Sequence, residues 1–380
     1  MKKRLVCIGL ALALLAGLSL TAAAEDLELP APSCILMEKQ TGQVLYESNA
    51  HEKLRPASVT KVMTLLLVAE AVESGAVSPD DPVTASRRAA SMGGSQIWLE
   101  EGEVMTVAEM TKCVAVVSAN DCAVALAEAL CGSEEAFVAR MNRRAEELGL
   151  SDTHFTNCTG LFEDAEHYTC AYDIAVISRE LLKHEFVRQY TTLWQDTIRS
   201  GEFGLTNTNK LVRHYNGCTG LKTGFTSTAM YCLAASAERG GVEYIAVILH
   251  GETSQLRFDA ARTLLDYAFA NYTLVMPETG APDVPVSLGK AASVRAVCES
   301  SGTVLIEKAR QKELSAVYEL PEKVDAPVAA GQLLGTLRYV AGNETIASVP
   351  ISAAESVERV GAGELWVRLA AALCGRTNTQ

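Results

Sequence analysis

The hydrophobic pattern changes period along the chain, and two pairs of short apolar runs bracket a long helical stretch. The first pair covers residues 34–37 and 43–46, and the second covers residues 231–237 and 242–249. Each pair flanks a segment that contains glycine, which is the pattern of a β-hairpin. Two distant hairpins bury their apolar faces most economically in a single sheet. We therefore predict one antiparallel sheet with the intervening helices packed on it.

The stretch between the hairpins predicts several helices. Pro56 and a run of helix formers indicate a buried helix that opens near Ser58. Thr106 and Glu109 have the spacing of a capping box, and apolar residues follow at helical spacing up to residues 118–121. Further helices are expected at residues 133–149, 173–183 and 260–270.

A segment rich in proline and glycine, residues 276–282, is the expected boundary between two domains. Residues 25–275 contain the hairpins and helices, whereas residues 283–354 contain only short alternating runs, which predict a small all-β domain. The predicted fold class is α+β, an antiparallel sheet flanked by helices and followed by this all-β domain. Residues 355–380 predict an amphipathic helix, for which contact with a membrane surface and docking on the protein itself are both open.

The first 24 residues have the pattern of a secretory signal peptide. Residues 1–4 are a basic start with two lysines and an arginine after the methionine, residues 5–20 are an apolar run, and residues 22–24 are three alanines that suit a cleavage site. A membrane anchor that is never cut is the alternative, but the apolar run is on the short side and the alanines favour cleavage. No later stretch is apolar for long enough to span a bilayer. We therefore expect the signal peptide, residues 1–24, to be removed from an exported protein.

The composition argues against some partners and cofactors. The chain has 33 basic and 46 acidic residues and a formal net charge of −13, so no nucleic-acid partner is expected. The six histidines show no ligand spacing and the 11 cysteines form no C-x-x-C pair, so neither a metal nor another cofactor is expected. Core packing is the expected role of the cysteines, and one or two disulfides stay open.

Ser58 and Lys61 lie three residues apart at the start of the predicted buried helix, so their side chains share one face one turn apart. A neutral Lys61 could remove the proton from the hydroxyl of Ser58. An exposed helix start is the alternative, but an unpaired lysine in an otherwise apolar helix would be costly. The pair is therefore a candidate nucleophile and base.

Two further polar motifs follow in the chain. Ser118 and Asn120 lie in the break between two predicted helices, where side chains can point into a cleft; a helix N-cap is the alternative. Lys222, Thr223 and Gly224 lie just before the second hairpin, where the glycine would let a ligand approach the backbone; an ordinary lysine at a strand entry is the alternative. The three motifs in this order are more specific than any one of them.

These motifs resemble those of the penicillin-recognising serine acyltransferases. The surrounding sequence is similar to the D-alanyl-D-alanine carboxypeptidases, the low-molecular-mass penicillin-binding proteins, in residues 56–64, 118–121 and 220–226. The resemblance covers essentially the whole mature chain. It implies a β-lactamase/transpeptidase-like fold and a bacterial protein outside the cytoplasmic membrane, at its outer face or in the cell-wall space. It also implies two ligands, a peptidoglycan stem peptide that ends in D-Ala-D-Ala and β-lactam antibiotics.

The resemblance implies a role for each motif residue. Ser58 would attack the carbonyl between the two D-alanines, and Lys61 would act as the base, with a pKa lowered by burial and by a second cation, Lys222. Ser118 would pass the proton to the leaving amine. Asn120 would hold Lys61 and the substrate amide.

The remaining expected residues bind the substrate. Lys222 and Thr223 would bind its terminal carboxylate, and Arg257 would add positive charge there; for Arg257 a solvated helix position is the alternative. The oxyanion hole would consist of the backbone N–H groups of Ser58 and of Phe225, the residue after Gly224.

Two other functions remain open. A serine β-lactamase shares the three motifs but adds a glutamate that activates the deacylating water, and no E-x-x-L-N occurs between Asn120 and Lys222. The all-β domain is also unexplained by a β-lactamase. A non-catalytic cell-wall module is the rival from another class, although no motif residue is missing. A small-ester hydrolase on this fold is a further alternative.

Overall fold

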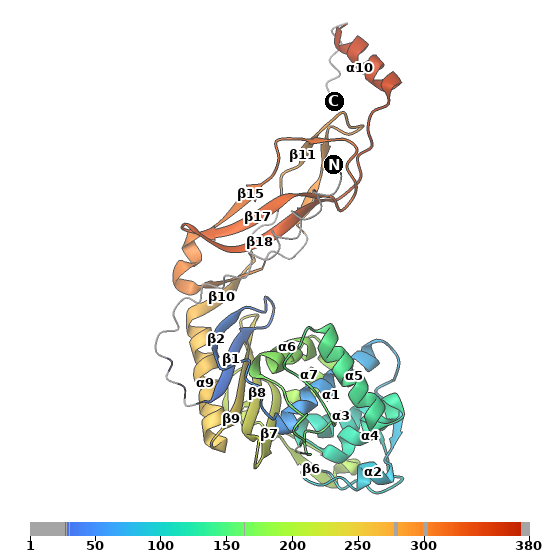
Figure 1. Cartoon of the computed structure of the whole chain (residues 1–380), viewed down its shortest axis with the longest axis vertical. Helices are drawn as coiled ribbons and strands as arrows, with labels where there is room; N and C mark the ends of the chain where they lie inside the picture. The colour runs from blue at the N-terminus through green and yellow to red at the C-terminus, as the bar shows by residue number, and fades with distance from the viewer. Residues whose placement is uncertain are drawn as a thin grey trace, which may run out of the picture. The chain divides into compact units, whose positions relative to one another are not determined.

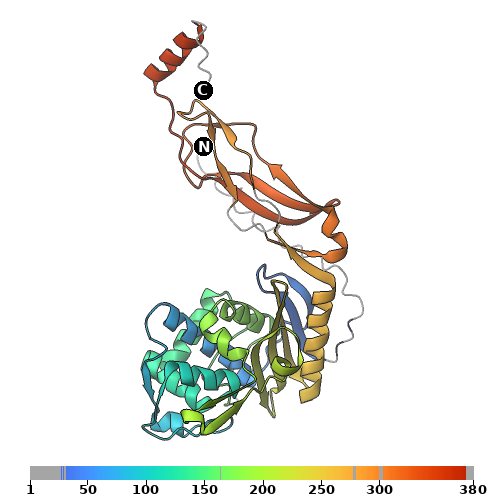
Figure 2. The same ribbon diagram turned by 180° about the vertical axis from the view of Figure 1, so that it is seen from behind.

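The computed structural model describes residues 27, 29, 31–162, 164–276, 280–298 and 303–373 (Figures 1 and 2). The chain divides into two compact units between Ala268 and Phe269. This division precedes the expected boundary because strand β10 (Tyr272–Val275) pairs with β14 (Val304–Glu307), within the second unit. The expected signal peptide, residues 1–24, lies outside the described residues.

The first unit contains one five-stranded antiparallel sheet in the order β2-β1-β9-β8-β7. The two predicted hairpins meet in it, because β1 runs antiparallel to β9 with Ser33 opposite Leu249. Their apolar runs are buried, which is the reason why they pair. The prediction of a single antiparallel sheet is confirmed. Its strands are β1 (Ser33–Glu38), β2 (Val44–Ser48), β7 (Cys218–Thr226), β8 (Met230–Arg239) and β9 (Val242–Gly251).

Helices cover both faces of this sheet. Figures 1 and 2 show α9 (Ser254–Asn271) along one face and the other long helices of the unit on the opposite face. The central helix, α1 (Lys61–Glu73), is buried almost all round, as its continuous apolar sequence requires. Its companions are α3 (Val107–Val116), α4 (Asn120–Cys131), α5 (Glu134–Glu147), α6 (Ala171–Leu181) and α7 (Glu185–Thr191).

Short elements link these helices and strands. The predicted capping box is present at the start of α3, where the side chains of Thr106 and Glu109 each accept the backbone N–H of the other. The remaining short elements are η1 (Ala57–Thr60), β3 (Pro82–Thr84), α2 (Arg87–Ala90), β4 (Val104–Thr106), β5 (Gln195–Ile198), η2 (Arg199–Gly201), β6 (Phe203–Thr206) and α8 (Leu211–His214).

The second unit is the predicted small all-β domain. Its largest sheet has the order β13-β18-β17-β15, and Leu337, Tyr339 and Ile351 are fully buried in its core. The elements after β10 are β11 (Val284–Ser287), β12 (Ser293–Val294), β13 (Ala296–Cys298), β14, η3 (Lys308–Glu313), β15 (Leu314–Glu319), β16 (Val324–Asp325), β17 (Leu333–Ala341), β18 (Glu344–Ala353) and α10 (Ala362–Leu373).

Helix α10 lies within the expected C-terminal segment and exposes apolar side chains. Trp366 and Val367 are largely exposed, and Leu365 and Leu369 are exposed to a lesser degree. Within the described parts of the chain, no helix combines the length and the apolar character that crossing a membrane requires.

The nine cysteines that the structure describes are all free thiols, and Cys113, Cys122 and Cys232 are buried as expected.

Candidate active site

Ser58 and Lys61 lie where the short helix η1 runs into α1. Lys61 is fully buried, whereas Ser58 is partly exposed. The Lys61 Nζ atom lies 2.9 Å from Ser58 Oγ, 2.6 Å from Asn120 Oδ1 and 2.8 Å from the carbonyl oxygen of Thr159. The oxygens of Asn120 and Thr159 hold the amine directly against the hydroxyl group of Ser58. The predicted pair is therefore in hydrogen-bond contact, at a position where the hydroxyl remains accessible.

Burial lowers the pKa of Lys61 to about 7, because desolvation penalises the ammonium form. The nearby Cys158 and Asp121 act in the opposite direction. The amine can thus be neutral near physiological pH, as a general base must be. The sequence hypothesis assigned part of this shift to Lys222, but burial is its leading cause.

Ser118 and Asn120 occupy the break between α3 and α4. Ser118 adopts a left-handed backbone conformation, with φ of 67°, and its buried Oγ atom has no hydrogen-bond partner within the described structure. Asn120 is the first residue of α4, and its Nδ2 atom donates to the carbonyl of Gly93 at 2.7 Å. That bond turns its Oδ1 atom toward Lys61. Ser118 therefore offers a free hydroxyl, while Asn120 holds the amine of Lys61.

Strand β7, at the edge of the sheet, contains the third motif. Lys222, Thr223 and Gly224 lie within this strand, rather than before the strands as expected from the sequence. A Cβ atom on Gly224 would lie 2.7 Å from the carbonyl oxygen of Pro56 and 3.0 Å from the nitrogen of Ser58. Only a residue without a side chain allows β7 to approach Ser58 so closely.

The side chains beside Gly224 are held in different ways. Thr223 Oγ1 donates to Thr208 Oγ1 at 2.7 Å, and the fully buried Lys222 Nζ donates to the carbonyl of Thr223 at 3.1 Å. Burial lowers the pKa of Lys222, and the charges of Lys61 and Arg257 lower it further. When Lys61 is neutral, the repulsion between the two lysines disappears. A bound anion beside Lys222 would favour its ammonium form.

Phe225 and Arg257 flank the end of the motif. The Phe225 ring is 53% exposed, and its centroid lies 4.3 Å from that of Tyr231. Arg257 is buried, contrary to the solvated alternative, and its Nη1 atom donates to the carbonyls of Gly224 and Cys232 at 2.8 and 3.0 Å. Arg257 thus holds the backbone of β7 at Gly224 and brings a positive charge close to Lys222.

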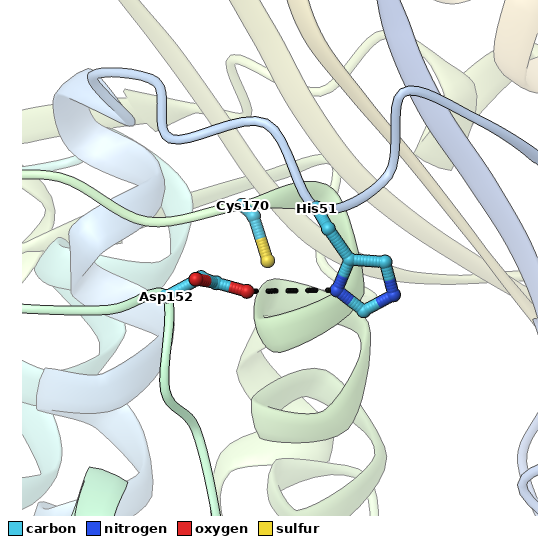
Figure 3. Close-up of side chains that lie close together, drawn as sticks. All are labelled: His51, Asp152 and Cys170. Carbon is cyan, nitrogen blue, oxygen red and sulfur yellow. Dashed lines mark ion pairs between the residues drawn. The ribbon is translucent and has the colours of Figure 1, made fainter.

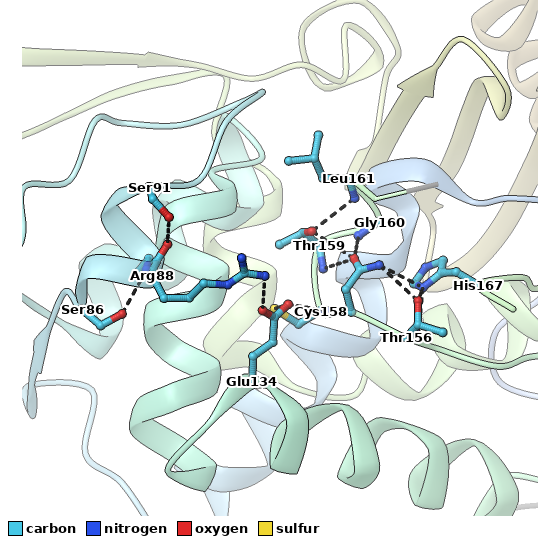
Figure 4. A network of polar contacts seen from close by, with 12 residues as sticks. Ser86, Arg88, Ser91, Glu134, Thr156, Cys158, Thr159, Gly160, Leu161 and His167 are labelled. Carbon is cyan, nitrogen blue, oxygen red and sulfur yellow. Dashed lines mark hydrogen bonds and ion pairs between the residues drawn. The ribbon is translucent and has the colours of Figure 1, made fainter. Parts of the chain in front are cut away.

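The loop at residues 156–161, drawn in Figure 4, contacts Lys61 through the carbonyl of Thr159 and was not predicted from the sequence. Asn157 Oδ1 accepts the backbone N–H groups of Thr159 and Gly160 at 3.1 and 2.6 Å, which directs the Thr159 carbonyl toward Lys61. A Cβ atom on Gly160 would lie 1.8 Å from the carbonyl oxygen of Ala57. The loop therefore packs directly against η1.

His167, which Figure 4 shows beside this loop, also contacts η1. Its Nδ1 atom accepts the backbone N–H of Thr156 at 3.0 Å, and its Nε2 atom lies 2.8 Å from Thr60 Oγ1. Thr60 in turn donates to the carbonyl of Ala57. Because Nδ1 accepts a hydrogen bond from Thr156, the ring has no place for a second proton on that nitrogen. Burial, assisted by His154, lowers the pKa of His167 to about 4.

The sequence motifs did not predict a structural role for Asp121 either. Its carboxylate is fully buried and accepts the backbone N–H groups of Ile97 and Leu99 at 3.0 and 3.1 Å. The preceding part of the same loop contacts Asn120, whose backbone N–H donates to the carbonyl of Ser95. Asp121 therefore helps to hold the loop at residues 95–99 beside Asn120. A carboxylate directly after the Ser118–Asn120 motif is the sequence feature that could have indicated this role.

The two parts of the chain match two family models. Residues 20–253 match the family described as D-alanyl-D-alanine carboxypeptidase, and residues 269–359 match the penicillin-binding protein 5 C-terminal domain.

Similar proteins agree with these matches. The D-alanyl-D-alanine carboxypeptidase DacF of Bacillus subtilis is 41% identical and covers 88% of both chains. DacC of Escherichia coli is 33% identical over 91% of this chain and 90% of its own. The crystal structure of penicillin-binding protein 5 from Haemophilus influenzae has a TM-score of 0.83 at 30% identity, over 89% of this chain and all of its own. The predicted fold class and enzyme class are confirmed, and the chain belongs to the D-alanyl-D-alanine carboxypeptidase family.

Proposed function

We propose that Ser58 is the nucleophile of this carboxypeptidase and that Lys61 is its general base. The observation that carries the proposal is the buried Lys61 amine, which lies 2.9 Å from Ser58 Oγ and has a pKa of about 7. Lys61 takes the hydroxyl proton while Oγ forms a bond to the carbonyl carbon between the two terminal D-alanines of a peptidoglycan stem peptide. The resulting intermediate is tetrahedral.

The intermediate then collapses to an acyl-enzyme. The carbon–nitrogen bond breaks, and the leaving amine of D-alanine receives a proton through Ser118, whose hydroxyl has no other partner in the described structure. Water, activated by the same base, attacks the ester and restores Ser58. The backbone N–H groups of Ser58 and Phe225 would stabilise the negative oxygen in both steps. The close approach of Gly224 to the Ser58 nitrogen supports this arrangement.

The terminal carboxylate of the substrate would lie against Lys222 and Thr223. Carboxylate binding offsets the cost of burying the Lys222 ammonium, because it supplies the missing opposite charge. Arg257 adds positive charge while its hydrogen bonds hold the backbone of Gly224. Asn120, which also holds Lys61, would receive the amide of the scissile peptide. β-Lactam antibiotics place a strained amide and a carboxylate in the same positions, so they would acylate Ser58 as well.

We also propose that the protein is exported and contacts the membrane surface through α10. The pattern of residues 1–24 supports export, and the exposed apolar side chains of α10 support membrane contact over docking on the protein. Among the α10 side chains that the structure describes, only Arg368 forms hydrogen bonds with the preceding β domain. It donates to the carbonyl oxygens of Gly289 and Lys290.

The catalytic proposal can be tested with the mature protein, residues 25–380. The protein is incubated in parallel with benzylpenicillin and with a peptide ending in D-Ala-D-Ala, and intact mass and released D-alanine are followed. We expect a persistent adduct on the peptide that contains Ser58, together with D-alanine release. Both should be lost in Ser58→Ala and kept in Ser91→Ala, which alters an exposed serine that caps α2.

Other outcomes would identify another function. An adduct that disappears quickly without D-alanine release would indicate a serine β-lactamase. The absence of any adduct in a folded protein would indicate a non-catalytic module. D-alanine release that persists in Ser58→Ala would contradict the assignment of the nucleophile.

A further inference from the structure

The fold brings a histidine, a carboxylate and a thiol together at a place that the catalytic proposal does not use. His51, Asp152 and Cys170 each offer one ligand atom, and these three atoms all lie within 4.8 Å of one another. Figure 3 shows the three side chains converging from separate segments of the chain. Because the residues are far apart in sequence, their spacing could not indicate a metal site, and the sequence predicted none.

Backbone hydrogen bonds fix the three segments relative to one another. The segment that contains His51 is joined to the segment that contains Cys170 by bonds from Tyr172 N to Ala50 O and between Leu54 and Thr169 in both directions. Asp152 is joined to the same region because its backbone N–H donates to Asp173 Oδ2 at 3.1 Å. The cluster is therefore organised by the fold before any ligand binds.

The separations suit a small cation. His51 Nδ1 lies 3.6 Å from Asp152 Oδ2, which matches two ligands on one edge of a tetrahedron with metal–ligand bonds of about 2.0–2.3 Å. All three ligand atoms lie within 4.8 Å of one another, so side-chain adjustment of at most about 1 Å brings them to that geometry. The His51 side chain is 58% exposed, so it can move and an ion can enter.

The environment of Cys170 allows a thiolate to form when a metal binds. A metal ion binds cysteine as the thiolate, so it must displace the thiol proton. Cys170 is also the N-cap residue of α6, and its Sγ atom accepts the backbone N–H of Asp173 at 3.4 Å. The positive end of the helix would stabilise the thiolate once it has formed.

Lys53 supplies a positive charge beside the Asp152 carboxylate, and its side chain can move away. Lys53 Nζ lies 3.6 Å from Asp152 Oδ1, and its side chain is half exposed. The same Nζ atom lies 4.9 Å from the centre of the Tyr168 ring, which offers it a place beside an aromatic face. A divalent cation can therefore replace Lys53 as the partner of Asp152.

We propose that His51, Asp152 and Cys170 form a binding site for a transition-metal ion of the zinc type, with the fourth position open to water. Nitrogen, oxygen and sulfur ligands select zinc and its neighbours over magnesium or calcium. The ion would tie the segment before η1 to the start of α6. The site is independent of the catalytic mechanism and would act on stability.

Cobalt(II) is the probe for this site, because it takes zinc positions and shows an absorption band when a thiolate binds it. Reduced, untagged mature protein is titrated with Co²⁺, and thermal unfolding is then measured with and without Zn²⁺. We expect a thiolate–Co²⁺ band that saturates at one equivalent, and a higher unfolding temperature with Zn²⁺. A protein that shows neither effect would overturn the proposal.

Three variants locate the site. Cys170→Ser keeps an N-cap acceptor for α6 and should lose the band, while His51→Ala, at an exposed position, should bind Co²⁺ more than about tenfold more weakly. Cys131→Ser removes a partly exposed thiol of α4 and should behave like the wild type. Labelling with benzylpenicillin shows that each variant is folded. A band that persists in Cys170→Ser, or binding unchanged in His51→Ala, would contradict the assignment.

Discussion

Lys61 shows how a single side chain acquires its role from its surroundings. Its amine has three oxygen partners, Ser58 Oγ, Asn120 Oδ1 and the Thr159 carbonyl, and no contact with water. The sequence predicted the first two of these partners, because Ser58 is one helical turn away and Asn120 belongs to a recognisable motif. It could not predict Thr159, because any residue can supply a backbone carbonyl. The sequence hypothesis gave two causes for a low pKa of Lys61, burial and the charge of Lys222, and burial is the leading cause in the structure.

The first residue-scale prediction concerns the pH dependence of acylation. Because only neutral Lys61 can accept the proton of Ser58, and its pKa is about 7, the acylation rate should rise with pH through about 7 and level off above it. The rate of labelling by fluorescent penicillin at subsaturating concentration measures this dependence. The pH runs from about 5 to about 9, two units on either side of the pKa of Lys61. A rate that continues to rise up to the ordinary range of lysine would contradict the assignment of Lys61 as the base.

A second residue-scale prediction concerns His167 and stability. Its pKa is about 4 in the folded protein and about 6.5 in the unfolded chain, so the unfolded state binds more protons between these values. The free energy of unfolding should therefore fall as the pH falls from about 6.5 to about 4, by about 3 kcal/mol, and this contribution should change no further below that range.

Urea unfolding at several pH values checks this contribution. In His167→Gln, which can still donate to Thr60 but does not titrate, the slope over this pH range should become smaller. His214→Gln is the control, because His214 also lies in the first unit and its side chain is solvent-accessible. Equal slopes in the wild type and His167→Gln would show that another group titrates instead.

At the scale of elements, the site depends on three segments that converge on η1. α1 follows it directly, β7 approaches it at Gly224, and the loop at residues 156–161 packs on it at Gly160. A run of helix formers after Pro56 predicted α1, apolar residues at helical spacing predicted α3, and short apolar runs around glycine predicted the hairpins. All of these elements are stabilised by burying apolar side chains. These patterns could not predict the loop, which is held by side-chain bonds from Asn157 and His167. Such bonds leave no periodic pattern in the sequence.

Gly160→Ala tests the contact between the loop and η1. The added Cβ atom would lie 1.8 Å from the Ala57 carbonyl oxygen, and φ is +71°, so the variant carries both a clash and backbone strain. Gly149→Ala is the matched control, because its φ is +74° and nothing lies within 4 Å. We expect the control to lose about 1 kcal/mol of stability, and Gly160→Ala at least about 2 kcal/mol together with most of its acylation rate.

Chemical unfolding and penicillin labelling measure the two effects. The difference between the variants isolates the clash from the strain, since strain is common to both. Similar stability and similar labelling rates would mean that the loop moves aside freely. The Thr159 carbonyl could not then be a fixed partner of Lys61.

At the scale of the whole molecule, each of the two units has its own hydrophobic core. The first is a sheet between helices and carries every motif residue, whereas the second is a small β domain with its own core and carries none. The sequence predicted both, and it placed the boundary a few residues late because the strand at residues 272–275 precedes the proline- and glycine-rich segment. The exposed helix α10 remains the feature that the packing of neither unit explains.

The last prediction concerns this helix. Deleting residues 361–380 should leave penicillin labelling and D-alanine release unchanged, because the helix supplies no motif residue, but should abolish sedimentation with phospholipid vesicles. Replacing Trp366 and Leu369 together by glutamate should have the same effect, since charged side chains oppose burial in the apolar part of the bilayer. Replacing the exposed Glu355 by glutamine is the control and should sediment like the wild type. If the truncated protein still sediments with vesicles, the membrane contact lies elsewhere; if the wild type does not sediment, the exposed face of α10 is not a membrane-binding surface.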